Sequence, residues 1–198
     1  MVITIQKIAL SLVCLSSLSV SGLTLDTALQ PCATAPLLIG KKQVGQASYF
    51  AQSCKKTWES QSIQMNFAYT QDIPEWAFKR AATHFLKKNI TNFQENSALN
   101  HITQLYKPVK NGDLYALLYT HPSKTLTLSL NQKKLGYIQN DQANQYFKIW
   151  LGPQPFNAKL KQQLLKLGWP AEDYAGYVDG DAHAIELVQK GWELRGYQ

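Results

Sequence analysis

Alternation of apolar and polar positions predicts the strands of this chain. Residues 63–69 (IQMNFAY) and 126–130 (LTLSL) place an apolar side chain at every second position, which is typical of a strand with one buried face. Residues 135–139 are the return strand of a hairpin across the turn at 131–134. Residues 114–119 are apolar throughout, which predicts either a central strand covered on both faces or a strand whose second face lines a cavity.

Apolar residues spaced three and four apart predict four helices after the first strand. Their apolar stripes run over residues 78–86, about 93–106, 143–151 and 160–167. Asp72 and Glu75 have the spacing of a capping box at the start of the first helix. Gly152 followed by Pro153 ends the third. This order of strands and helices predicts an α+β fold, in which helices pack on one face of a large antiparallel sheet.

The N-terminus has the features of a secretory signal peptide. Lys7 precedes a short apolar run at 8–15, and Ser19 and Ser21 are small residues at the two positions that a signal peptidase reads. We therefore expect residues 1–21 to be a signal peptide and the protein to be periplasmic or secreted. A buried N-terminal helix is the alternative.

Three segments follow the expected signal peptide. Residues 22–39 show no clear period and are interpreted as an extended leader, 40–168 as the folded domain, and 169–198 as a helical C-terminal tail. The chain has 198 residues, of which 45% are hydrophobic, and this suits one compact domain with its own core.

Charge and hydropathy limit the classes of partner. The formal net charge is +7, from 20 lysines and arginines against 13 acidic residues. The lysines are spread along the chain and Arg80 and Arg195 are the only arginines, so no arginine-rich run predicts a nucleic-acid partner. Peripheral contact with anionic surfaces remains an alternative to plain solvated lysine faces. No stretch reaches the ~18 apolar residues of a membrane span.

Two cysteines remain once the expected signal peptide is removed. Cys32 and Cys54 are predicted to form a disulfide, worth about 3 kcal/mol for a loop of this length, and two free buried thiols are the alternative. No spacing typical of a metal site is present, so we expect neither a metal nor a cofactor. Acidic residues in the tail fit a turn and helix cap better than a cation site: Asp179, Asp181, His183 and Glu186.

Several motifs resemble the bacterial chalcone isomerase-like proteins. The hairpin LNQKKLGYI, the helix ending in IWLG and the continuation to Leu165 resemble the most recognisable block of that family. VKNGDLYALLY resembles its turn and strand, and MNFAYTQDIPEWAFKRAA its strand and helix entry. The resemblance covers roughly residues 40–166 and implies a sheet with helices on one face and a ligand cleft between the layers. Relatives of that fold include flavonoid-cyclising enzymes and non-catalytic fatty-acid binders.

The chain departs from the family pattern at polar positions. Gln71 stands where many relatives have an arginine, while Gly45 and Gln46 stand in place of a tyrosine and an aspartate. Glutamine cannot supply the charge or the two-pronged donors of a guanidinium. Both an isomerase site and a charged anchor at Gln71 are therefore weakened.

The resulting expectation is a ligand cleft without assigned catalytic residues. The side chains expected to line it are Tyr49, Tyr69, Gln71, Trp76, Tyr119 and Trp150. Plain core packing is the alternative for the tyrosines and tryptophans. The favoured function is non-catalytic binding of a small apolar or amphipathic ligand such as a fatty acid. An isomerase (intramolecular lyase) of chalcone isomerase type and a structural or interaction protein with a filled cleft are the alternatives.

Overall fold

The computed structural model describes residues 28–165 of the chain. The expected signal peptide and the tail at 169–198, with its acidic cluster, lie outside the described residues. The predictions about those segments therefore stay predictions.

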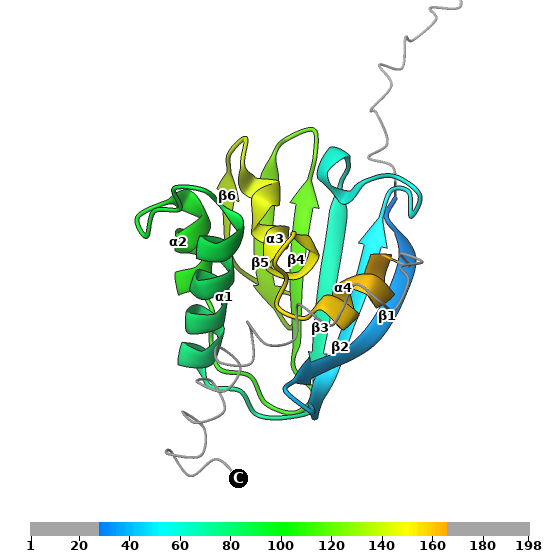
Figure 1. Cartoon of the computed structure of the whole chain (residues 1–198), viewed down its shortest axis with the longest axis vertical. Coiled ribbons are helices and arrows are strands. Elements are labelled where there is room, and N and C mark those ends of the chain that lie inside the picture. The colour runs from blue at the N-terminus through cyan, green and yellow to red at the C-terminus, as the bar shows by residue number, and fades with distance from the viewer. Residues whose placement is uncertain (1–27, 166–198) are drawn as a thin grey trace, which may run out of the picture.

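Six antiparallel strands form one sheet in which each strand pairs with the next strand along the chain (Figure 1). The strands are β1 (Gln30–Ile39), β2 (Lys42–Ala51), β3 (Ile63–Tyr69), β4 (Leu114–Thr120), β5 (Thr125–Leu130) and β6 (Lys133–Gln139). The strands predicted from alternation are thus present within a residue or two.

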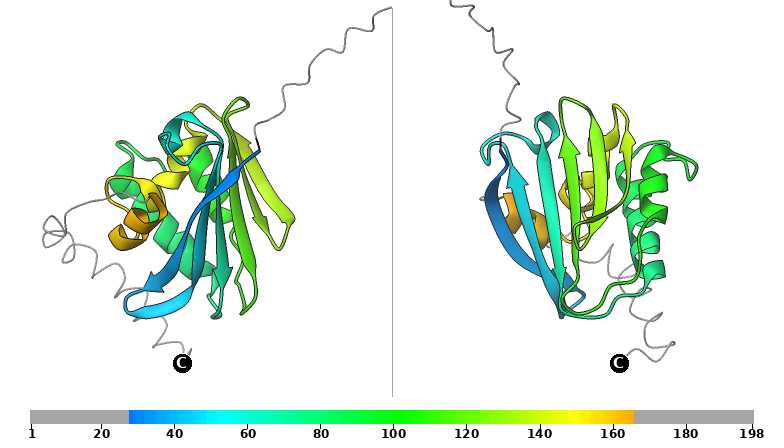
Figure 2. Two further views of the ribbon diagram at one scale, coloured as in Figure 1. Left: turned by 90° about the vertical axis from the view of Figure 1, so that its right-hand side faces the viewer. Right: turned by 180° about the vertical axis from the view of Figure 1, so that it is seen from behind.

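The helices lie on one face of this sheet, as the edge-on view in Figure 2 shows. They are α1 (Glu75–Asn89), α2 (Ala98–Gln104), α3 (Lys148–Leu151) and α4 (Ala158–Leu165), with short 3-10 turns at η1 (Trp58–Ser60) and η2 (Ala143–Phe147). This arrangement confirms the predicted α+β class with helices on one face of an antiparallel sheet.

Three helix predictions need correction. The helix expected at 93–106 is only the seven residues of α2, Ala98–Gln104. The stretch 143–151 is a 3-10 turn followed by one turn of α-helix rather than a continuous helix. The capping box at α1 is also absent, because Asp72 Oδ1 accepts a hydrogen bond from the Asn111 backbone N–H at 3.1 Å. Asp72 thus ties the entry of α1 to the turn before β4.

The stretch interpreted as a leader contains a strand. Residues 30–39 form β1, which pairs with β2 along one edge of the sheet. The pairing shifts register between Pro31 and Ala33 and again between Leu37 and Leu38. Each bulge adds a residue and reverses which face the side chains point to. The extra residue is Cys32 of β1 at the first shift and Val44 of β2 at the second, so the alternation within β1 is broken once, after Cys32.

The predicted disulfide is confirmed. Cys32 in β1 is bonded to Cys54, which follows β2, across a sequence separation of 22 residues. The bridge joins the beginning of the edge strand to the loop that leads into β3.

β4 differs from both alternatives offered by its apolar sequence. Tyr115, Leu117 and Tyr119 are buried beneath the helices, while Ala116 and Leu118 are half-buried on the opposite face. On that face their strand neighbours are polar, and no residue of β4 lines the cavity described below. β4 is therefore a central strand with one covered face.

Candidate functional site

A cavity of about 180 Å³ lies between the sheet and the helices. The sheet contributes Leu37 and Ile39 of β1, Val44 of β2, and Phe67 and Tyr69 of β3. The predominantly apolar walls make this the expected kind of site for a small organic ligand.

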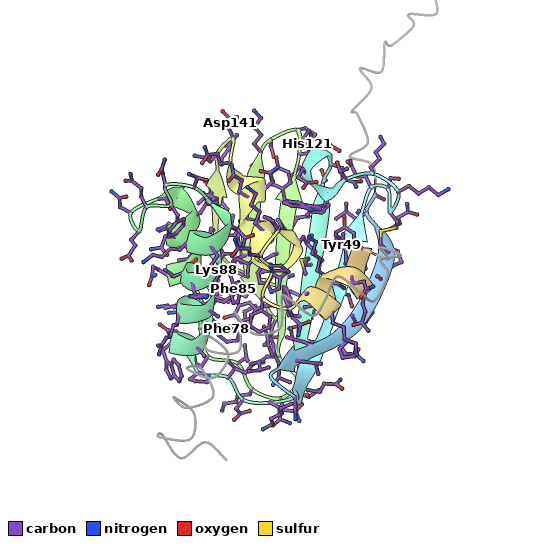
Figure 3. All side chains as sticks on the ribbon, in the orientation of Figure 1. Tyr49, Phe78, Phe85, Lys88, His121 and Asp141 are labelled. Atoms are coloured by element: carbon purple, nitrogen blue, oxygen red, sulfur yellow. A yellow bond between two sulfur atoms is a disulfide. The ribbon has the colours of Figure 1, made fainter. Side chains whose placement is uncertain are left out.

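Small residues of α1 create the space, and aromatic residues of the same helix bound it. Ala77, Ala81 and Ala82 line the cavity between the larger side chains of Phe78 and Phe85. Figure 3 labels Phe78 and Phe85 on the side of α1 that faces the middle of the sheet. Since an alanine extends only one carbon from the helix, this part of α1 cannot fill the volume in front of β3.

Aromatic pairs connect the two walls of the cavity. The rings of Tyr69 and Phe78 meet edge to face at 5.5 Å between centroids, and those of Phe67 and Trp150 lie 4.8 Å apart. Such pairs add about 0.5–1.5 kcal/mol beyond the area they bury. They fix the spacing between β3 and the helical layer around the cavity.

Asn89 holds the far wall in place. Its side-chain amide donates to the Phe85 and Gln154 carbonyls at 2.8 and 2.6 Å, and its Oδ1 accepts from the Gln154 N–H at 2.9 Å. These bonds tie the end of α1 to the segment that carries Phe156, whose ring lies 5.6 Å from that of Phe85. A buried polar residue thus positions an apolar wall.

Two tyrosine hydroxyls beside the cavity differ in their partners. The Tyr106 hydroxyl faces that of Tyr146, which lies 3.0 Å from the hydroxyl of Thr103. Tyr69 is 6% exposed, and its hydroxyl forms no hydrogen bond with any residue of the range 28–165. Burial raises the pKa of Tyr69, so the phenol is a neutral hydrogen-bond donor at neutral pH. A ligand atom in the cavity can therefore accept a bond that the protein leaves unmade.

The basic residues at the cavity come from α1, and Arg80 carries the charge. Arg80 and His84 both line it and, four residues apart on one helix, lie on the same side. Within the part of the chain that the structure describes, no aspartate or glutamate lines the cavity. The lining therefore favours an anion over a cation.

The structure places two of the six side chains expected to bind ligand at the cavity. Tyr69 and Trp150 line it, whereas four do not: Tyr49, Gln71, Trp76 and Tyr119. The cavity lies at the end of β3 that carries Phe67 and Tyr69. Tyr49 and Tyr119 pair with Met65 and Ile63, nearer the opposite end of that strand.

The sequence analysis missed several cavity residues. Leu37 and Ile39 fall in the stretch interpreted as a leader, and Arg80 is considered only as one of two arginines in the charge balance. Arg80 carried one usable signal, because it is the only arginine before the C-terminal tail. Tyr106 and Phe156 gave no signal, since apolar spacing does not distinguish a cavity wall from core.

Residues 28–165 contain neither a group of metal ligands nor a helix that could span a membrane. No three histidine, cysteine, aspartate or glutamate side chains in that range are grouped as metal ligands. None of its helices has both the length and the apolar character needed to cross a bilayer.

Comparison with known proteins identifies the family. The chalcone isomerase-like family model matches residues 44–166, which is most of the described domain. The chain belongs to the chalcone isomerase-like family. The structure of a fatty-acid binding protein from Arabidopsis thaliana superimposes on this chalcone isomerase-like domain with a TM-score of 0.55 at 13% identity, covering 69% of this chain and 86% of that one. The predicted family and fold are confirmed.

Short matches to helicases stand apart from the family match. The chain is 77% identical over 39 residues to the DNA 3'-5' helicase XPB of Kineococcus radiotolerans, which is 20% of this chain and 7% of that protein. It is 70% identical over 40 residues, again 20% and 7%, to the same helicase of Mycobacterium tuberculosis. The chain spans only 7% of the length of these curated relatives, so their activity is not carried over to this chalcone isomerase-like protein.

The structure explains why position 45 is a glycine in this chain and not the tyrosine of many relatives. A Cβ at Gly45 would lie 2.0 Å from the Ala68 carbonyl oxygen, so the backbone of β3 occupies the place of a side chain there. The tyrosine that we aligned with Gly45 has no room in this arrangement of β2 and β3. Gln71 does not line the cavity, and it leaves the position of the family arginine without a charge.

Proposed function

We propose that this is an exported, non-catalytic member of the chalcone isomerase-like family that binds a small amphipathic ligand in the cavity between sheet and helices. The observation that carries the proposal is the apolar cavity whose wall includes the Tyr69 hydroxyl, which has no hydrogen-bond partner within residues 28–165. A ligand oxygen beside that hydroxyl would accept a hydrogen bond worth about 0.5–1.5 kcal/mol.

The cavity also favours ligand binding over a filled cleft. Apolar ligands gain about 0.8 kcal/mol for each CH₂ removed from water, so binding here requires no reactive group. A fatty-acid binding protein with the same fold supports the ligand class. The name of that protein supports the chemical class of the ligand proposed here, but it does not set the size of that ligand.

Export is supported by two features. The charged start, apolar run and small residues of the first 21 positions are those of a signal peptide. The Cys32–Cys54 disulfide suits an oxidising compartment such as the periplasm. N-terminal sequencing of the mature protein from a secreting host tests this, and an uncleaved N-terminus would contradict it.

Calorimetry with phenylethanol tests binding in the cavity. The alcohol has an aromatic ring for the apolar walls and one hydroxyl for Tyr69, and we expect saturable binding by the purified protein. Ala81→Leu, which fills the cavity from α1, should abolish binding while the protein stays folded. The matched control is Ala68→Leu on the exposed face of β3, which should bind as the wild type does. Failure of the wild type to bind, or equal binding by Ala81→Leu, would refute the proposal.

A further inference from the structure

We propose that the ligand is a small organic acid, one aromatic ring or a short alkyl chain in size, whose carboxylate is bound by Arg80 at the mouth of the cavity. This inference rests on the proposed function and narrows it to a charge and a size. It rests on the cavity volume, the position of Arg80 and the pairing of the neighbouring charges.

The volume sets the size of the apolar part. An apolar cavity of about 150 Å³ holds one benzene molecule, and this one measures about 180 Å³. It therefore accepts about six to eight carbons. The remainder of a long acyl chain would stay outside the walls formed by Phe67, Phe85 and Trp150.

Arg80 is placed where a ligand charge can remain near water. It lines the cavity, yet its side chain is exposed, so it lies at the mouth rather than in the interior. A carboxylate bound there keeps part of its hydration and avoids the large cost of full burial. The guanidinium offers two parallel donors that match the two oxygens of a carboxylate.

The acids nearest to Arg80 along the chain already have partners, and Asp72 accepts a hydrogen bond from the Asn111 backbone N–H. Glu75, the one acidic residue of α1, pairs with Lys79, and Glu95 beyond the helix pairs with Lys87 at 2.5 Å. Within residues 28–165, Arg80 itself has no ion pair and no hydrogen bond from its side chain. The guanidinium is therefore available to an anion that enters the cavity.

The proposed charged anchor, Arg80, lies on a different element from Gln71, the position at which many relatives have an arginine. Gln71 follows β3 and cannot bind a carboxylate as an arginine does. Arg80 lies on α1, beside Ala77 and Ala81, which create the space for the apolar part. The same helix thus supplies the cation for the carboxylate and the space for the apolar part of one small acid.

Comparing the affinities of phenylacetate and phenylethanol separates the contribution of the carboxylate from that of the aromatic ring. We expect wild type to bind phenylacetate about tenfold or more tightly than phenylethanol, as charged hydrogen bonds allow. Arg80→Gln should remove that advantage and leave phenylethanol affinity within about twofold. Lys133→Gln removes one charge from an exposed position of β6, away from the cavity, and should change neither affinity.

The outcomes are distinguishable. If phenylethanol does not bind the wild type, the proposed function fails. If it binds but phenylacetate gains nothing, or the gain survives Arg80→Gln, the assignment of Arg80 is overturned while the proposed function stands.

A series of straight-chain acids tests the size limit. Affinity should rise from hexanoate to octanoate and then level off towards hexadecanoate, measured below its micelle concentration. An increase of about fourfold for each CH₂ through the whole series would overturn the size limit, because it would mean that the entire chain is buried.

Discussion

Gly45 shows how one missing side chain determines the geometry beside the cavity. The backbone of β3 approaches it so closely that a Cβ would meet the Ala68 carbonyl oxygen at 2.0 Å and Tyr69 Cα at 3.1 Å. Tyr69 is the residue paired with Gly45, and it is the cavity residue with the unpartnered hydroxyl. The close approach of β2 and β3 therefore contributes to the position of the polar group available to a ligand.

Gly45→Ala is expected to lower the free energy of unfolding by about 1–3 kcal/mol, because the added methyl group forces two backbones apart. Gly136→Ala is the matched control, since its Cβ would meet only the movable end of the Leu105 side chain at 2.4 Å. Chemical denaturation of both variants gives the comparison. Equal stability of the two would contradict the explanation.

α1 is the element on which the cavity depends. It supplies the small residues that leave space, the aromatic residues that bound it, and Arg80 at its mouth. Its C-terminal end is fastened to the segment after α3 by Asn89, whose amide bonds Gln154 in both directions. The position of α1 therefore sets the width of the cavity.

Asn89→Ala should lower the free energy of unfolding by about 1–3 kcal/mol, because backbone groups near Gln154 lose buried partners. It should also weaken phenylethanol binding, since Phe156 is no longer held against Phe85. Asn144→Ala, which removes an exposed side-chain bond to the Glu59 carbonyl, should cost less than about 0.5 kcal/mol. Wild-type stability of Asn89→Ala would show that the bonds to Gln154 are dispensable.

The edge strand β1 depends on its disulfide. Replacing Cys32 and Cys54 together by serine should cost about 3 kcal/mol, because the bridge closes a loop of 22 residues. β1 carries Leu37 and Ile39, so the variant should also bind ligand less tightly. Urea denaturation of the variant, and of the wild type with reductant, should give the same loss. An unchanged midpoint would contradict this.

For the molecule as a whole, the periodicity of apolar residues predicted the sheet and the helices that cover it, but not the cavity between these two layers. The strands with unbroken alternation, β3 and β5, were located from sequence, whereas the bulge at Cys32 interrupts the alternation of β1. The cavity could not be predicted, because Ala77 and Phe156 have the same apolar signature in a wall as in a core. Arg80 resembled a solvated helix charge for the same reason: sequence gives the spacing of residues on a helix but not what lies opposite them.

Buried tyrosines should make the whole domain sensitive to alkali. Burial raises the pKa of Tyr49 and Tyr115 from 10.0 to about 12, and it also raises the pKa of Tyr69, Tyr106 and Tyr146. The folded state therefore keeps protons that the unfolded chain loses above pH 10.0, so the stabilisation is complete below that pH and is lost as pH rises towards 12.

Each such phenol should lower the free energy of unfolding by up to about 1.4 kcal/mol per pH unit in that interval. Urea denaturation over a range of alkaline pH measures the slope. Tyr49→Phe should reduce it by the share of one phenol. A stability that does not change with pH there would contradict the burial of these hydroxyls.

The order of the strands has a consequence for the rates at which the domain folds and unfolds. Neighbouring strands are joined by short connections except β3 and β4, which are separated by residues 70–113 and with them α1. Closing that long loop should be the slow step, because it orders the most chain before any contact forms. The cavity needs α1 in place, so it is complete only after this step. A bound acid should therefore prolong the lifetime of the folded protein without shortening the time the chain needs to reach it.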